Sequence, residues 1–175
     1  MVDLPAMNRQ TSRMLLCLGS NQGDREAQLQ HALDALGGLE GTVLRAVSHC
    51  YETEAWGEPD QPAFLNLAAE IETAMAPLEL LNAIKDIERA LGREPAARWG
   101  PRTIDIDIIL CEGAVLDTPE LSVPHREFRN RAFVLSPLAE IAGETKDPVT
   151  GSTISELANR PEASGQVRRV HKLDH

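Results

Sequence analysis

Two spacings of apolar residues alternate along residues 14–111, and their order limits the possible folds more than any other feature of the sequence. Strand-like runs cover Met14–Leu18, Thr42–Thr53, Phe64–Thr73 and Ile104–Cys111. Helical spacing lies between them, once between Asp24 and Gly37 and again from Pro77 to Leu91. The order is therefore strand, helix, strand, strand, helix, strand, which predicts a split βαβ unit.

This order is typical of a ferredoxin-like sandwich, an α+β fold in which helices pack on one face of an antiparallel sheet. Extra C-terminal helical segments are expected: residues 126–141 have helical character that Pro137 should break, and residues 154–158 predict a last short helix. Residues 1–13 lack an apolar run and are expected to form a flexible extension. At 175 residues the chain suits one core better than two, so residues 14–175 are predicted to form a single domain.

The composition excludes several classes of partner. A formal charge of -10 argues against broad binding to nucleic acid or to an anionic membrane, because both require a basic surface. Cys17, Cys50 and Cys111 are far apart and odd in number, so neither a disulfide framework nor a zinc site is indicated. No stretch approaches the roughly 20 apolar residues of a membrane span. A cytoplasmic protein, expected to be a monomer, follows.

Two aspartates on one predicted strand are the strongest candidates for chemistry. If residues 104–108 are extended, Ile104, Ile106 and Ile108 face the core, while Asp105 and Asp107 share the other face about 6.6 Å apart. Two carboxylates so placed repel each other, and a hard cation such as magnesium removes that cost. The alternative is a strand that merely exposes a polar face to water.

Basic side chains lie close to these aspartates in the sequence. Arg98 and Arg102 come immediately before the strand, and guanidinium groups next to a metal site suit a bound polyphosphate. A second basic segment contains His125, Arg129 and Arg131, and His125 is a candidate phosphate donor. A lone histidine is otherwise more often a surface or hydrogen-bonded core residue.

Four blocks of the sequence, in the family's order, resemble 6-hydroxymethyl-7,8-dihydropterin pyrophosphokinase. They are Leu18–Asn21 with Gly23 and Asp24, Asp60–Pro62 with Phe64–Asn66, Arg98–Asp107, and Val123–His125 with Asn130, Arg131 and Phe133. Together they cover the chain from about residue 14 to residue 160. The resemblance implies a ferredoxin-like fold, ATP as the donor, two magnesium ions and AMP as the leaving group.

The resemblance also assigns residues on the metal and ATP side. It implies that Asp105 and Asp107 bind the metal ions, and that Arg93 and Arg102 act with them in catalysis. The residues that it implies for ATP binding are Arg93, Arg98, Arg102, Ile108, His125, Arg126 and Arg131. Triphosphate binding is expected to depend more on the other arginines, because Pro95 stands where some relatives carry another arginine.

On the pterin side, the resemblance implies that Phe64 and Phe133 are the two rings that sandwich the flat bicycle. Asn66 offers both a donor and an acceptor to the pterin edge. Thr53 and Trp56 are implied as the wall of the pocket, largely through backbone groups. Phe64 lacks the hydroxyl that a tyrosine would supply, and Arg126 stands where some relatives have an aromatic hydroxyl. Neither departure removes a metal ligand.

The predicted function is therefore transfer of pyrophosphate from ATP to 6-hydroxymethyl-7,8-dihydropterin, which makes the pterin diphosphate for folate synthesis. Dihydropteroate synthase is the expected functional neighbour. One alternative is a non-catalytic ferredoxin-like module that binds an effector, because a fold does not determine a function. Another is a related enzyme that transfers a single phosphoryl group or a nucleotidyl group.

Overall fold

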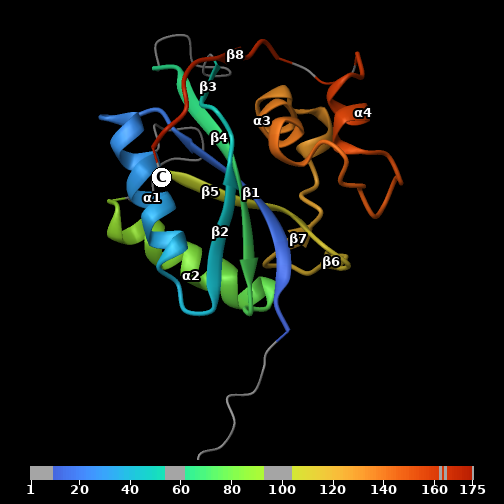
Figure 1. The fold of residues 1–175 in the computed structure, drawn as a ribbon, viewed down its shortest axis with the longest axis horizontal. Helices are drawn as coiled ribbons and strands as arrows, with labels where there is room; N and C mark the ends of the chain where they lie inside the picture. Colours follow the sequence, from blue (N-terminus) through green and yellow to red (C-terminus); the bar gives the residue numbers. More distant parts are fainter. Residues whose placement is uncertain (1–9, 54–61, 93–103, 162, 164, 175) are drawn as a thin grey trace, which may run out of the picture.

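The computed structural model describes residues 10–53, 62–92, 104–161, 163 and 165–174. At its centre lies a six-stranded sheet (Figure 1). Its strands are β1 (Ser12–Ser20), β2 (Thr42–Val47), β3 (Tyr51–Thr53), β4 (Phe64–Thr73), β5 (Asp105–Cys111) and β8 (Arg168–Arg169). They are ordered β5-β1-β4-β3-β8, β2 also pairs with β4, and every pairing is antiparallel. The predicted α+β fold with an antiparallel sheet is confirmed.

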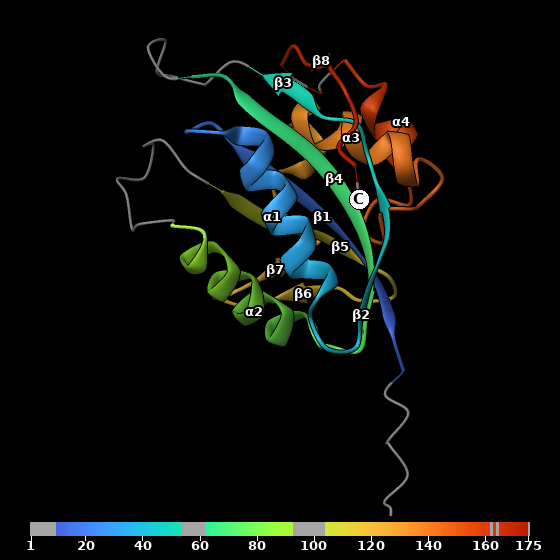
Figure 2. The same ribbon diagram turned by 60° about the vertical axis from the view of Figure 1, so that its left-hand side comes forward.

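Helices cover both faces of this sheet, as Figures 1 and 2 show. One face carries α1 (Arg25–Gly37) and α2 (Pro77–Ala90), and the other carries α3 (Ala132–Ala142) and α4 (Ile154–Ala158). The two helices of the predicted split βαβ unit therefore lie on one face, as expected, and the expected C-terminal helices cover the other face. Both faces need apolar cover because the run Met14–Leu18 of β1 is buried on both sides of the sheet.

Each pair of helices encloses its own apolar cluster. We call the cluster under α1 and α2 the first core, to which β1 contributes Leu16 and Leu18. The cluster under α3 and α4 is the second core, to which β1 contributes Leu15 and Cys17. The strand alternation therefore divides one element between two cores.

The helices of the first core begin and bury their residues as the sequence predicts. The Asp24 side chain accepts a hydrogen bond from the amide of Ala27 at 3.1 Å and caps α1. Pro77 lies at the start of α2, where its missing N–H costs nothing. The buried positions of the two helices are Leu29, Ala32, Leu33, Leu36, Leu80, Ile84, Ile87 and Glu88.

Two predicted elements differ from the observed ones. The strand expected over residues 42–53 is divided into β2 and β3, because Ser48 interrupts the ladder and its hydroxyl accepts the amide of Ala68 at 2.9 Å. The helix expected from residue 126 begins only at Ala132, after a short 3-10 helix, Phe128–Asn130. Pro137 lies inside α3 and does not end it, because the helix is held by buried apolar residues on both sides of the proline.

Three short strands have no counterpart in the prediction. β6 (Leu116–Asp117) and β7 (Ser122–Val123) form a hairpin that leads to the segment around His125. β8 pairs with β3, so residues near the end of the chain close one edge of the sheet. Within the described residues, no helix is both long enough and apolar enough to cross a membrane.

Candidate active site

The sheet face that carries α3 and α4 also carries four predicted site residues, Phe64 and Asn66 of β4 and Asp105 and Asp107 of β5. Gly19 of β1 is opposite both Asp105 and Asn66, and Cys17 is opposite Asp107. Directly opposed residues in an antiparallel pair point to the same face. Both aspartates are partly exposed. The two carboxylates therefore share one accessible face, as the alternation predicts, with Ile104, Ile106 and Ile108 buried in the first core.

An irregular register separates this polar end of β5 from its apolar end. Leu16 is opposite Ile108 whereas Leu15 is opposite Leu110, so Ile109 is an extra residue on β5. Ile109 and Leu110 both pack in the second core. The irregularity allows β5 to bury consecutive apolar side chains under α3 and still present the two aspartates beside them.

Gly19 makes room between the two halves of the site. A Cβ atom at this position would lie 2.5 Å from Oδ1 of Asn66 and 3.8 Å from Cδ1 of Phe64. Only glycine allows Asn66 to lie over β1 in this way. The sequence marked Gly19 as a turn residue and missed this role, although its place at the end of an apolar strand was a usable signal.

Cys17 is a buried free thiol that lies beneath the two carboxylates. Its side chain is buried in the second core. Burial, together with the charges of Asp107 and Asp105, raises the pKa of the Cys17 thiol well above its ordinary value. The residue is therefore a neutral thiol in the floor of the site and has no nucleophilic character at neutral pH.

Asn66 and Thr53 form a buried polar pair next to Phe64. The Nδ2 group of Asn66 donates to the Thr53 hydroxyl at 3.1 Å, and both residues are less than a tenth exposed. Thr53 is opposite Phe64 in the sheet. Because Nδ2 has a fixed partner, the orientation of the Asn66 amide is fixed as well. Trp56, the other residue predicted for this wall, lies outside the described residues.

The three phenylalanines have two kinds of environment. Phe128 is fully buried in the second core. Phe64 and Phe133 are only partly buried, and Phe133 packs against the edge of that core. Partial burial leaves an aromatic face available to a flat ligand. The guanidinium of Arg131 lies 5.7 Å from the centre of the Phe133 ring. A residue predicted for ATP binding and one predicted for pterin binding are therefore neighbours at the start of α3.

His125 is bound to β5 and lies within electrostatic reach of both aspartate and arginine. Its amide donates to the carbonyl of Ile109 at 2.8 Å. The ring Nδ1 accepts the amide of Glu127 at 3.2 Å, so the neutral ring carries its proton on Nε2. Burial and the charge of Arg131 lower the pKa of His125, although Asp105 acts in the opposite direction. The ring is therefore a neutral donor at physiological pH.

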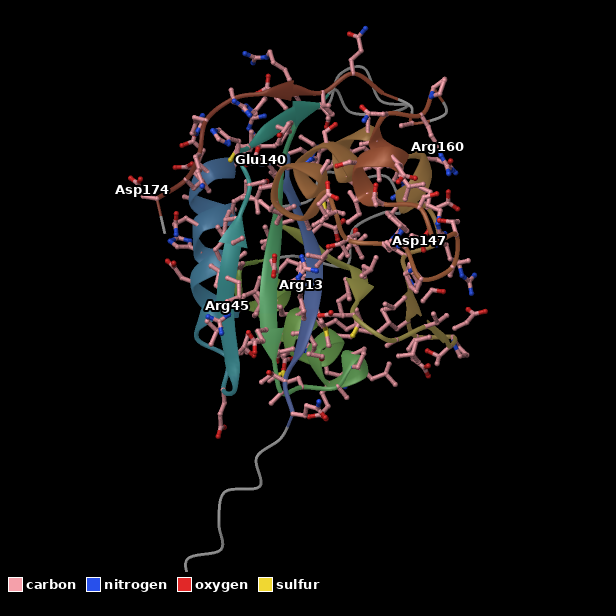
Figure 3. All side chains as sticks on the ribbon, turned by 45° about the vertical axis from the view of Figure 1, so that its right-hand side comes forward. Arg13, Arg45, Glu140, Asp147, Arg160 and Asp174 are labelled. Atoms are coloured by element: carbon pink, nitrogen blue, oxygen red, sulfur yellow. The ribbon has the colours of Figure 1, made fainter. Side chains whose placement is uncertain are left out.

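Two arginines of the second basic segment have carboxylate partners. Arg126 donates to Asp117 at 2.7 Å and is largely exposed on the β6–β7 hairpin. Arg129 forms two hydrogen bonds with the fully buried Asp147, at 2.5 Å and 2.8 Å. Figure 3 labels Asp147, in the loop between α3 and α4. Arg129 therefore fastens the 3-10 helix to this loop.

Polar contacts at the C-terminal end of α3 fix the helix over the sheet. Glu140, labelled in Figure 3, accepts the Tyr51 hydroxyl at 2.8 Å and the amide of His49 at 2.9 Å. Burial and the Glu140 carboxylate raise the pKa of Tyr51 to about 12, so the hydroxyl keeps its proton. Just beyond the same end, Arg13 of β1 binds Glu70 of β4 at 2.7 Å and Thr145 at 2.8 Å. These contacts hold the C-terminal end of α3 against the sheet.

The remaining predicted residues divide into two groups. Arg93, Arg98 and Arg102 lie outside the described residues. Ile108 is described, and its side chain is 3% exposed in the first core. That side chain points away from the carboxylates, so only the backbone of Ile108 faces any ligand bound to them.

A comparison with family models assigns the chain. A model described as 7,8-dihydro-6-hydroxymethylpterin-pyrophosphokinase (HPPK) matches residues 15–143. The chain belongs to this family. It is therefore an ATP-dependent pyrophosphokinase of folate biosynthesis, and its reaction is pyrophosphoryl transfer to the hydroxymethyl pterin. HPPK membership excludes the alternatives of a non-catalytic module and of an enzyme that transfers a single phosphoryl group.

Individual relatives agree with the family model over most of the chain. A 2-amino-4-hydroxy-6-hydroxymethyldihydropteridine pyrophosphokinase from Methylorubrum extorquens is 45% identical over 159 residues, which are 91% of this chain and 99% of that protein. The protein of the same name from Pseudomonas aeruginosa is 46% identical over 145 residues, which are 83% of this chain and 89% of that protein. The matches therefore span nearly the whole length of both relatives.

A solved structure of low sequence identity has the same fold. The crystal structure of wild-type Plasmodium falciparum HPPK-DHPS with pteroate gives a TM-score of 0.68 at 18% identity and covers 88% of this chain. The match covers 43% of that chain, so this HPPK spans less than half the length of the Plasmodium protein. This structural similarity supports the fold described above.

Proposed function

We propose that pyrophosphoryl transfer takes place on the α3 side of the sheet, with Asp105 and Asp107 as ligands of two magnesium ions. The observation that carries this proposal is that both carboxylates share one accessible face next to Asn66 and His125. Magnesium prefers oxygen ligands and is commonly held by one or two carboxylates together with phosphate oxygens and water. Two adjacent aspartates therefore fit this ion without a larger protein cage.

The chemistry needs little covalent help from the chain. The hydroxymethyl oxygen of the pterin forms a bond to the β-phosphorus of ATP, the bond from that phosphorus to the oxygen bridging the α-phosphorus breaks, and AMP leaves. The hydroxyl proton is lost to water or a nearby base. Bound magnesium neutralises the negative charge that develops on the phosphates. The task of the protein is to align the two substrates and exclude water.

On the pterin side, we assign recognition to Asn66 and stacking to Phe64 and Phe133. The Asn66 amide is held by Thr53, which leaves its carbonyl and a second N–H hydrogen for the pterin edge. The two rings lie on different elements, β4 and α3, and both are only partly buried. A flat bicycle between them gains contact on both sides. Trp56 is proposed to complete the wall.

On the ATP side, we assign the triphosphate to cationic and neutral donors around β5. His125 is supported because the charges of Arg131 and Asp105 both act on its ring. Arg131 is supported because Cys17 feels its charge together with the charges of both aspartates. Arg93, Arg98 and Arg102 are proposed from sequence alone, with Arg93 and Arg102 acting in catalysis. The Ile108 backbone is proposed for the nucleoside. Arg126 binds ATP only if it leaves Asp117.

Two broader assignments also remain proposals. Residues 14–175 are proposed to act as one pyrophosphokinase domain, because the C-terminal β8 strand pairs with β3 of the central sheet. The proposed consumer of the product is dihydropteroate synthase, since the fused HPPK-DHPS chain suggests that the two steps are neighbours.

The direct test is to follow AMP formation with ATP, the hydroxymethyl pterin and a range of magnesium concentrations. Asp105→Asn should abolish magnesium-dependent turnover while the protein still binds the pterin. Chelation of the metal should do the same in the unaltered protein. Full activity of Asp105→Asn at ordinary magnesium concentrations would show that the metal site lies elsewhere.

A further inference from the structure

Glu88 of α2 is a charged side chain buried in an apolar layer. It is only 5% exposed, and the neighbouring buried residues of the helix are Ile84 and Ile87 of the first core. Its Oε2 atom accepts the amide of Ile106 at 3.2 Å. A buried carboxylate is costly and is kept only where hydrogen bonds or charges compensate for it. The amide that Glu88 binds lies between Asp105 and Asp107.

The position of β5 in the sheet explains why this amide needs an acceptor. At Ile106, β1 is the one neighbouring strand in the described part of the chain, and Leu18 is opposite Ile106. Amides alternate along an antiparallel strand between the partner strand and the opposite side. Because the Ile106 amide points to α2, the amides of Asp105 and Asp107 point to β1. Glu88 therefore binds the edge of β5 that faces away from β1, at the same point where β1 binds the other edge.

We propose that Glu88 is a positioning residue for the two metal-binding aspartates. Its hydrogen bond holds the peptide between Asp105 and Ile106 in the pleat that directs both carboxylates to the same face. Without this bond, an edge strand with a buried unsatisfied amide would shift or twist to recover a partner. This inference rests on the proposed role of Asp105 and Asp107 in holding magnesium. It adds a residue from α2, the helix layer on the opposite face of the sheet.

The test compares three variants of α2 in the full chain. Glu88→Gln keeps an oxygen that can accept a hydrogen bond from the Ile106 amide. Glu88→Leu removes the acceptor but fills a similar volume with an apolar side chain. Ile84→Ala, at a position 1% exposed on the same helix, is the control for a purely structural loss. Thermal unfolding of each protein establishes a temperature at which all three are folded.

The readouts separate positioning from general destabilisation. Mn²⁺ affinity is measured by electron paramagnetic resonance with a non-hydrolysable ATP analogue, and exchange of the Ile106 amide is measured by NMR. We expect Glu88→Leu to weaken Mn²⁺ binding about tenfold, a scale typical of the loss of a residue that supports a metal ligand. Exchange of the Ile106 amide should become about tenfold faster or more, because the amide loses its hydrogen-bond acceptor. Glu88→Gln should stay within about threefold in both, and Ile84→Ala should retain the Mn²⁺ affinity.

Two results overturn the inference. In the first, Glu88→Leu and Ile84→Ala bind Mn²⁺ with the same affinity. In the second, Glu88→Gln loses as much Mn²⁺ affinity as Glu88→Leu does. Asp105→Asn, measured in parallel, separates this failure from failure of the proposed function. If Asp105→Asn retains full Mn²⁺ affinity, the metal site itself is misassigned. If it loses affinity and Glu88→Leu does not, only the positioning role is wrong.

Discussion

The two faces of the central sheet use the same strands but carry different layers (Figure 2). The first core is apolar along β1, β4 and β5, and it meets α1 and α2. On the other face, α3 and α4 cover the apolar part of β1 and β5, and Asp105, Asp107 and Asn66 lie beside that cover. One face therefore supplies mainly stability, and the other combines a smaller core with the site. Substitutions on the two faces should consequently have separable effects.

The largest effect is expected from removing a charge on the polar part of the second face. Asp107→Asn should lower kcat/KM by on the order of 10³-fold, because a charge needed to stabilise the transition state is lost. The melting temperature should not fall, since the repulsion from Asp105 is relieved. AMP formation and thermal unfolding measure the two quantities. The control is Asp34→Asn, an exposed aspartate of α1 that accepts a hydrogen bond from Gln30.

A substitution in the first core should produce the opposite pattern. Leu16 is fully buried there, and Leu16→Ala should lower the free energy of unfolding by about 3 kcal/mol. At a temperature well below the melting midpoint, kcat/KM should stay within about threefold of the original value because no site residue moves. Urea unfolding and steady-state kinetics measure this. A loss of activity as large as that of Asp107→Asn in the folded protein would contradict the division between faces.

The second core has a polar anchor whose strength depends on pH. Burial opposes ionisation of Asp147, but hydrogen bonds from Arg129 and Thr150 outweigh it and lower its pKa to about 2. An unfolded aspartate has a pKa of about 3.9, so this anchor stabilises the protein fully above about pH 5 and is lost as the pH falls toward 2. The expected loss is about 2 kcal/mol.

Asp147→Asn isolates that contribution. The unfolding free energies of the two proteins should differ most at neutral pH and should converge as the pH falls through 2, because the carboxyl then becomes protonated in both states of the original protein. Denaturant unfolding at several pH values provides the measurement. A difference that stays constant down to pH 2 would mean that the charge of Asp147 is not the stabilising feature.

The smallest effect is expected from a methyl group at the boundary of the site. Gly19→Ala would place Cβ 2.5 Å from Oδ1 of Asn66 and must displace that side chain. We expect KM for the pterin to rise about tenfold, the cost of one poorly aligned hydrogen bond, and KM for ATP to stay unchanged. Gly37→Ala is a matched control, because its Cβ would meet only Leu44 Cβ at 3.9 Å. An equal change in both KM values would refute the assignment of Asn66 to the pterin.

The sequence predicted the parts of the fold that depend on local periodicity. Residues 64–73 alternate cleanly, and β4 has the predicted bounds. The second helix begins at Pro77, as its position in the first turn indicates. The division of residues 42–53 at Ser48 was missed because it depends on a hydrogen bond to Ala68 on another strand. No local pattern contains that information.

The site was predictable where family motifs and strand alternation agree. Alternation alone placed Asp105 and Asp107 on one face, and the structure agrees. Gly19 and Cys17 were missed because their importance comes from the register of β1 between β4 and β5. The structural role of Arg129 was not predicted because its partner, Asp147, is distant in the sequence. Long-range pairings of this kind are visible only in the folded protein.

The pairing of β8 with β3 protects one edge of the sheet from contact with other chains. The amide of Cys50 donates to the carbonyl of His171 at 2.7 Å, and the amide of Val170 donates to the carbonyl of Cys50 at 2.8 Å. Without residues 168–171, the backbone groups on the outer side of β3 would lose these partners. An edge with unsatisfied backbone groups can pair with a second protein chain. The β8 segment therefore guards the folded protein against aggregation.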